Sequence, residues 1–200
     1  PINPYGKSKL IIENVLRDLA LSHGTKSVIL RYFNAAGASP NTTLGELHEP
    51  ETHIIPLTID AAINKKPILK IFGNDYDTFD GTCIRDYIHV SDLAEAHVLA
   101  LKFLDKKNSR DDKFCEEFNL GNGKGISVKE IVNSVEKITN KKVPYRIVQR
   151  RDGDPDILVA SSKKARAELK WKPKYEEIDT MVMHAYKWFL KIQSLKNEKK

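Results

Sequence analysis

The sequence has little cysteine and no long apolar run. Its 200 residues include only two cysteines, Cys83 and Cys115, and they form no CxxC pair. No His or Cys cluster has metal-site spacing, so no metal is expected. Reduced thiols and a cytoplasmic location are the expectation. No apolar stretch approaches the roughly 20 residues that cross a bilayer, and no signal-peptide pattern stands at the N-terminus, so we expect no membrane association.

Positive charge is what the chain has in excess, at a net +6. Its last ten residues carry four lysines against Glu198 alone, a pattern typical of a solvated helix end. Nucleic-acid-binding proteins usually interleave basic and aromatic residues on one face, and no such stripe is present, so no nucleic-acid partner is expected. At 40% hydrophobic and 30% charged residues the composition is that of a globular chain.

Apolar periodicity predicts helices that alternate with strands. Helices are expected over residues 5–23, 53–66, 91–104, 127–140, 161–171 and 176–193. Strands are expected over 27–33, 68–73, 83–90, 114–120 and 144–149, with long loops at 34–52 and 74–82. This alternation indicates an α/β fold. Because the chain opens on a helix that leads to a strand, we expect it to be the C-terminal part of something larger.

Two helix starts have recognisable caps. Ser91 is expected to cap the helix over 91–104, with Ala94, Val98 and Leu101 on its apolar face. Ser127 is expected to cap the helix over 127–140, and Glu130 three positions later would complete a capping box.

Tyr5 and Lys9, in "YGKSK", stand four residues apart. On a helix this spacing places both side chains on one face, and the ammonium would favour the phenolate form of the tyrosine. About one Tyr–Lys pair at this spacing is expected by chance in a chain of this composition. Taken alone, the pair is therefore interpreted as two ordinary residues rather than as a catalytic base, until other residues support the catalytic interpretation.

Two further segments carry chemistry. "LGNGKG" has the spacing G-x-G-x-G rather than a dinucleotide-binding G-x-G-x-x-G, which favours a plain strand-to-helix turn over a phosphate site. Arg85 suits bidentate binding of a phosphate, and a salt bridge to Asp86 is the alternative. Arg151 and Asp154 flank a second glycine turn, so two arginines on separate loops would clamp a diphosphate while an aspartate accepts ribose hydroxyls.

Five segments in order resemble one family: "PYGKSK", "RYFNAAGA", "IFGNDYDTFDGTCIRDYIHVSDLAEAH", "NLGNGKGISVKEIV" and "RRDGDPDILVASSKKARAELKWKP". The chain resembles, nearly end to end, the UDP-glucose 4-epimerases, which are extended short-chain dehydrogenases/reductases. The resemblance implies a Rossmann-type α/β fold with a smaller α/β substrate-binding domain. Residues 1–35 would be the remnant of the NAD-binding domain. Residues 36–200 would mainly form the UDP-sugar domain, with some segments returning to the Rossmann sheet.

The resemblance also implies a reaction, the interconversion of UDP-glucose and UDP-galactose in galactose metabolism. In the family a tyrosine phenolate takes the proton of the sugar 4-hydroxyl while the C4 hydride moves to NAD. The 4-keto sugar then rotates, and the hydride returns to its other face. Tyr5 matches the catalytic base, and Lys9 matches its partner at the nicotinamide ribose.

The remaining site residues follow from the same resemblance. Tyr32 and Phe33 match positions beside the nicotinamide, and Asn34 one that contacts the sugar nucleotide. The other implied substrate contacts are His53 and Ile54 for the phosphate-sugar region, Lys70 and Phe72 for uracil, Arg85 and Arg151 for the diphosphate, Asp154 for the ribose, and Leu158 at the position that limits the size of the sugar.

The chain departs from the family pattern in one large respect. The Gly-rich dinucleotide loop and the catalytic Ser or Thr of the family precede the tyrosine, and this chain carries neither. We therefore expect the chain alone neither to hold NAD nor to turn over UDP-galactose, and we expect a homodimer only for the full-length protein. Alternatives that stay open are an epimerase for UDP-N-acetylhexosamines or UDP-pentoses, a nucleotide-sugar dehydratase, and a noncatalytic UDP-sugar-binding fragment.

Overall fold

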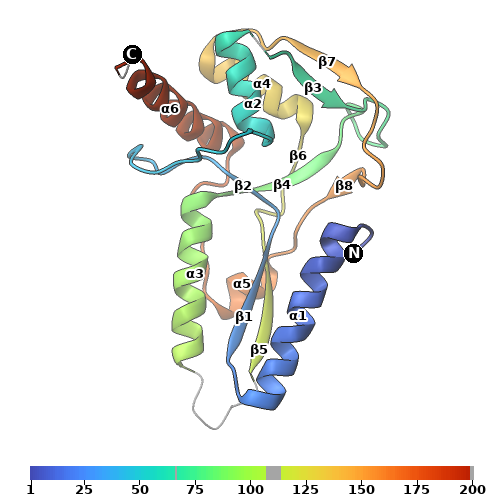
Figure 1. Ribbon diagram of the computed structural model, residues 1–200, viewed down its shortest axis with the longest axis vertical. Helices are drawn as coiled ribbons and strands as arrows, with labels where there is room; N and C mark the ends of the chain where they lie inside the picture. The colour runs from blue at the N-terminus through green and yellow to red at the C-terminus, as the bar shows by residue number, and fades with distance from the viewer. Residues whose placement is uncertain (66, 107–113, 199–200) are drawn as a thin grey trace.

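A computed structural model describes residues 1–65, 67–106 and 114–198, and its elements gather into two groups joined by a central strand (Figure 1). Lys66, the last residue of a predicted helix, and the terminal Lys199 and Lys200 lie outside the described residues. The helices and strands otherwise follow the predicted order closely.

The first group surrounds a pair of parallel strands, β1 (Ser27–Tyr32) and β5 (Cys115–Leu120). Three helices flank this pair, α1 (Pro4–His23), α3 (Val90–Asp105) and α5 (Lys163–Glu168), with α1 and α3 on opposite sides of it in Figure 1. The core of this group draws on α3, α5, β5 and the end of β4, and consists of Ile88, Ala96, Phe118, Leu120, Ala165, Leu169 and Trp171.

The second group packs three helices against a second parallel pair of strands. The helices are α2 (Ile54–Asn64), α4 (Val128–Thr139) and α6 (Ile178–Asn197), and the strands are β3 (Leu69–Phe72) and β7 (Tyr145–Val148). Residues such as Ile59, Ile71, Ile131 and Val182 are almost wholly buried in its core. Ser127 and Glu130 form the predicted capping box at the start of α4.

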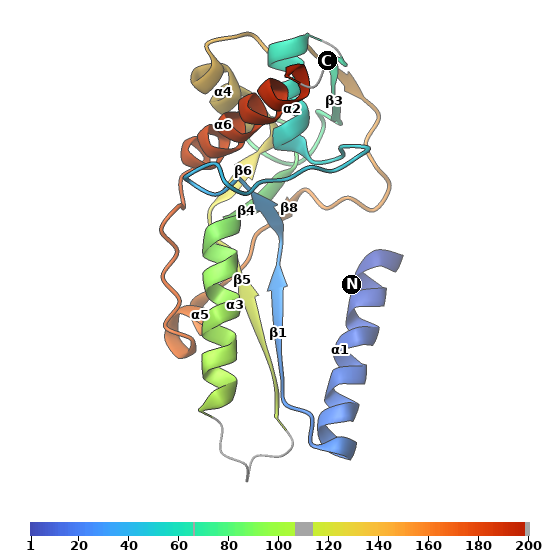
Figure 2. The same cartoon turned by 60° about the vertical axis from the view of Figure 1, so that its left-hand side comes forward.

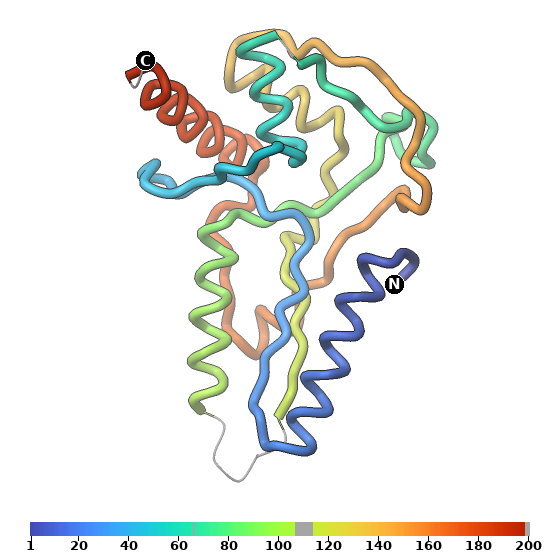
Figure 3. The backbone as a smooth tube through the Cα atoms, in the orientation of Figure 1, coloured from blue at the N-terminus to red at the C-terminus, as the bar shows by residue number. Residues whose placement is uncertain are grey.

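Strand β4 (Ile84–His89) lies between the two groups and leads directly into α3, a path that Figures 2 and 3 trace along the chain. It pairs with three short strands, β2 (Asn34–Ala36), β6 (Gly125–Ser127) and β8 (Ile157–Leu158). The sequence predicted none of these three: residues 34–52 were expected to be all loop. Each is only two or three residues long and depends on pairing with β4 rather than on a pattern of its own.

Asp86 in β4 is fully buried and binds the main chain of two other segments. Its carboxylate accepts the N–H groups of Asn122 at 2.9 Å, Gly123 at 3.0 Å and Ala160 at 3.1 Å. The alternative salt bridge between Arg85 and Asp86 is therefore wrong, because neighbouring strand residues point to opposite faces. The main-chain N–H groups of the "LGNGKG" segment do bind a carboxylate, but it is that of Asp86. This contact favours the interpretation of the segment as a strand-to-helix turn over a phosphate site.

Two predictions about α3 are wrong. The N-cap is His89, whose ring Nδ1 accepts the Ser91 N–H at 3.0 Å, so Ser91 already lies inside the helix. The expected apolar face of Ala94, Val98 and Leu101 is exposed. The helix instead buries Ala96 and Ala100, since only small side chains fit where α3 packs closely.

Helix α1 likewise exposes apolar side chains. Ile11, Ile12 and Val15 are each at least half exposed, while the buried Glu13 pairs with Arg31 of β1. Hydrogen bonding to Arg31 lowers the pKa of Glu13. Within the described ranges, no helix combines the length and the apolar character needed to cross a membrane.

The buried His89 predicts a loss of stability in acid. Burial, helped by the nearby His184, lowers the pKa of His89 to about 4. The native ring stays neutral down to that pH, whereas the ring in the unfolded chain takes up a proton near its ordinary pKa of about 6.5. The free energy of unfolding should therefore fall as the pH drops from about 6.5 to 4, by on the order of 3 kcal/mol from this group.

Urea unfolding at several pH values measures this slope. His89→Gln should flatten it, while a matched change at the exposed ring of His97, His97→Gln, should leave it unchanged. If the free energy of unfolding of His89→Gln falls with pH as steeply as that of the wild type, another group is responsible for the loss of stability in acid.

Candidate functional site

The Tyr5–Lys9 pair forms as the spacing predicts, in the first turns of α1. Asn3 caps this helix by accepting the N–H of Gly6 at 2.8 Å, and Pro4 begins it. The Lys9 Nζ lies 5.1 Å from the centre of the Tyr5 ring. The Tyr5 side chain is 73% exposed, so its hydroxyl is open to a ligand while the lysine charge stays beside its ring.

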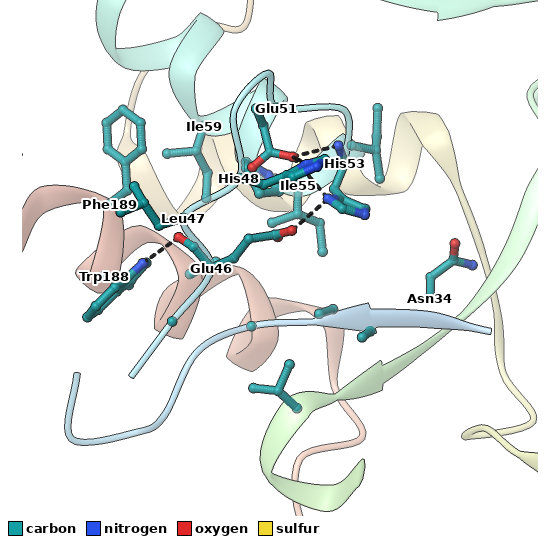
Figure 4. A pocket seen from close by; sticks show the side chains of 18 of the residues that line it. Asn34, Glu46, Leu47, His48, Glu51, His53, Ile55, Ile59, Trp188 and Phe189 are labelled. Carbon is teal, nitrogen blue, oxygen red and sulfur yellow. Dashed lines mark hydrogen bonds and ion pairs between the residues drawn. The ribbon is translucent and has the colours of Figure 1, made fainter. Parts of the chain in front are cut away.

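Six of the predicted site residues line one cavity of about 960 Å³, part of which Figure 4 shows. These residues, from α1, β1, β2 and the start of α2, are Tyr5, Tyr32, Phe33, Asn34, His53 and Ile54. The far wall comes from residues 44–49 and from α6, where Trp188 Nε1 donates a hydrogen bond to the main-chain oxygen of Glu46 at 2.7 Å. We refer to this space as the Tyr5 cavity.

Four side chains with metal-binding chemistry meet on the wall of the Tyr5 cavity (Figure 4). The ligand atoms of Glu46, His48, Glu51 and His53 lie within 4.8 Å of one another, although the sequence indicated no such cluster. His53 Nδ1 is 2.7 Å from Glu46 and 3.0 Å from Glu51, so one imidazole contacts both carboxylates. Burial and the nearby Glu51 charge raise the pKa of Glu46.

A second set of predicted residues gathers at the junction of β4, β8 and the loop over residues 149–156. Arg85 forms an ion pair with Asp154 that is largely buried on the arginine side. The guanidinium of Arg151 lies 4.0 Å from the centre of the Phe72 ring. Tyr76 donates its hydroxyl to Asp154 at 3.3 Å. We call Phe72, Tyr76, Arg85, Arg151 and Asp154 the arginine group.

Strand register places the last two predicted residues beside the arginine group. Leu158 pairs with Arg85 across β8 and β4, and its side chain is 44% exposed. Lys70 is exposed two residues before Phe72 on β3, so both face away from the buried Leu69 and Ile71.

Asn34 connects the two parts of the candidate site. It lines the Tyr5 cavity, and its side-chain Nδ2 donates to the main-chain oxygen of Asp86 at 2.9 Å, one residue from Arg85. None of the arginine group lines the Tyr5 cavity itself. The structure therefore brings the predicted residues together as two neighbouring sets joined through β2 and β4, rather than around one enclosed space.

The sequence interpretation missed Tyr76, Glu46 and Trp188. Tyr76 sits in the quoted "NDYDTFDGT" loop, and its hydrogen-bond partner Asp154 is 78 residues away, so no local spacing could reveal the contact. Glu46 and Trp188 are 142 residues apart. The unusual length of the 34–52 loop was the one signal that pointed to the cavity wall.

Comparison with known proteins identifies the family. The family model described as GDP-mannose 4,6 dehydratase matches residues 1–184. The chain belongs to this family. It is thus an extended short-chain dehydrogenase/reductase, as the resemblance implied.

Curated relatives and solved structures agree with this assignment. A UDP-glucose 4-epimerase of Halalkalibacterium halodurans is 50% identical over 94% of this chain and 55% of its own length. The structure of the Brucella ovis UDP-glucose 4-epimerase in complex with NAD matches with a TM-score of 0.86 and 46% identity, over 94% of this chain and 57% of that one. The Bifidobacterium longum enzyme in complex with NAD+ and UDP gives 0.87 and 38%, over 95% and 55%.

These matches confirm the predicted α/β fold of Rossmann type and the resemblance to UDP-glucose 4-epimerases. The chain spans about half the length of the curated relatives it matches.

Proposed function

We propose that this chain carries the UDP-sugar-binding part and the catalytic tyrosine of an NAD-dependent UDP-glucose 4-epimerase. The reaction would interconvert UDP-glucose and UDP-galactose by inverting C4 through a transient 4-keto sugar, in galactose metabolism. Residues 1–35 would belong to the NAD-binding domain, and residues 36–200 mainly to the substrate domain, with α3 and β5 lying beside β1 of the former.

One observation carries this proposal. Phe72, Arg85 and the turn that carries Arg151 and Asp154 come from three separate segments of the sequence. In the folded chain Arg85 pairs with Asp154, Arg151 lies over Phe72, and the Asp154 N–H donates to the Arg151 main-chain oxygen at 3.3 Å, which joins the two contacts. Two guanidinium groups, an aromatic face and a carboxylate are the groups that a diphosphate, a base and a ribose require. In the free protein Arg85 pairs with Asp154, and the Arg151 guanidinium lies over the Phe72 ring. A diphosphate would offer both guanidinium groups a stronger partner.

Tyr5 would act as the base at the sugar. Its phenolate oxygen would take the proton of the 4-hydroxyl and later return it, and the ammonium of Lys9 lies 5.1 Å from the ring centre. The residues present fit a nicotinamide: Tyr32 and Phe33 offer aromatic surface on the Tyr5 cavity, and Tyr32 is half exposed. Bound NAD would supply the acceptor for the C4 hydride.

The proposal extends to assembly and location. A homodimer of the whole protein would cover the apolar side chains that α1 exposes, among them Ile11 and Val15. Cys83 and Cys115 are both free thiols, which suits the reducing cytoplasm.

Binding of UDP tests the arginine group without any need for catalysis. In isothermal titration of the 200-residue chain, Arg85→Ala and Arg151→Ala should each weaken UDP at least tenfold, because each removes a charged hydrogen-bond donor to phosphate. The matched control is Arg146→Ala, an exposed arginine on β7. Affinity unchanged in both arginine variants would contradict the proposed clamp.

Epimerisation tests Tyr5. In a protein that joins the N-terminal part of the Halalkalibacterium halodurans relative to residue Pro1 of this chain, conversion of UDP-galactose to UDP-glucose is the measurement. Tyr5→Phe should lower kcat by about a hundredfold or more, because the proton acceptor is lost. Tyr145→Phe, at an exposed tyrosine on β7, should not. A Tyr5→Phe rate within twofold of the parent would rule out Tyr5 as the base.

A further inference from the structure

We infer that Tyr76 is a positioning residue that holds the Asp154 carboxylate ready for the ribose hydroxyls of the nucleotide. The inference rests on the proposed function, since it assigns Tyr76 a part in binding the UDP portion of the substrate.

The two oxygens of Asp154 have different partners. Oδ1 accepts Arg85 Nη2, and Oδ2 accepts the Tyr76 hydroxyl at 3.3 Å. A diphosphate that draws Arg85 away would free Oδ1, while the uncharged Tyr76 hydroxyl would keep its hold on Oδ2. One oxygen of the carboxylate then stays fixed and the other becomes available to a ribose hydroxyl.

Asp154 needs such a hold because its own backbone gives it little support. It follows Gly153, whose φ of +71° marks a turn with open space around it. Its main-chain N–H makes only a long bond to Arg151 O at 3.3 Å. The side chain is about a quarter exposed, so without Tyr76 the carboxylate would be free to rotate once Arg85 leaves.

Tyr76, in contrast, is rigidly placed. It is only 4% exposed, and the guanidinium of Arg150 lies 3.8 Å from its ring centre. Gly73 lies close to both, because a Cβ there would come within 2.5 Å of Arg150 Cγ and 2.6 Å of Tyr76 Cε2. Its main-chain N–H donates to Gly81 O at 3.1 Å. A hydroxyl on a ring this well buried keeps its direction when the ligand arrives.

The chemistry of the phenol suits a permanent donor. Burial, followed by the charge of Asp154, raises the pKa of Tyr76 above its ordinary value. The hydroxyl therefore keeps its proton at neutral pH and donates it to the carboxylate.

The test compares two ligands, UDP and 2′,3′-dideoxyuridine 5′-diphosphate, by isothermal titration of the 200-residue chain. Tyr76→Phe keeps the ring and removes only the hydroxyl. It should weaken UDP about tenfold, as expected for a lost hydrogen bond to a charged group, and weaken the dideoxy ligand less than twofold. Tyr145→Phe is the matched control and should leave both affinities unchanged.

A second variant changes the packing of the Tyr76 ring without removing its hydroxyl. Arg150→Met removes the guanidinium above the Tyr76 ring and leaves the hydroxyl in place, so it should reduce the preference for UDP over the dideoxy ligand by a smaller factor.

The possible results distinguish a failure of the proposed function from a failure of the role proposed for Tyr76. Wild-type chain that binds neither ligand overturns the proposed function and this inference with it. If UDP binds and depends on Arg85, but Tyr76→Phe binds both ligands as wild type does, the function stands and the inference is wrong. Equal weakening of both ligands in Tyr76→Phe also overturns it, because that is the result of a merely structural role.

Discussion

The candidate site depends on one buried charge, the carboxylate of Asp86. It lies in the middle of β4 and accepts three main-chain N–H groups from the 121–124 turn and from Ala160. Breaking such a set leaves several buried donors unpaired, which is costly. Since neighbouring residues of a strand face opposite ways, fixing Asp86 on the inner side also fixes Arg85 on the other, where it meets Asp154.

The same strand relates the two parts of the site. Asn34 of β2 binds the main-chain oxygen of Asp86 and lines the cavity that Tyr5 also lines. Leu158 of β8 pairs with Arg85. A nucleotide held by the arginine group would thus lie beside β4, which pairs with both β2 and β8 and so supports both sets of candidate residues.

The sequence predicted the long helices and strands because their patterns are local. Apolar spacing located α4, with its Ser127 cap, and the β-branched run of β1. The strands β2, β6 and β8 were not predicted because each depends on pairing with β4. Most site residues were found only through resemblance to a family. Arg85 illustrates the limit: its real partner, Asp154, is 69 residues away, whereas local reasoning offered the adjacent Asp86. Tyr76 was missed for the same reason.

A crystal structure of the chain with UDP tests the central claim most directly, namely that β4 directs Arg85 into a nucleotide site completed by the 149–156 loop. The account predicts the diphosphate between Arg85 and Arg151, the ribose on Asp154 and the uracil against Phe72, with the Asp86 contacts to Asn122, Gly123 and Ala160 intact. UDP bound away from β4, or an Arg85 that still pairs with Asp154 while the phosphates lie elsewhere, would contradict it.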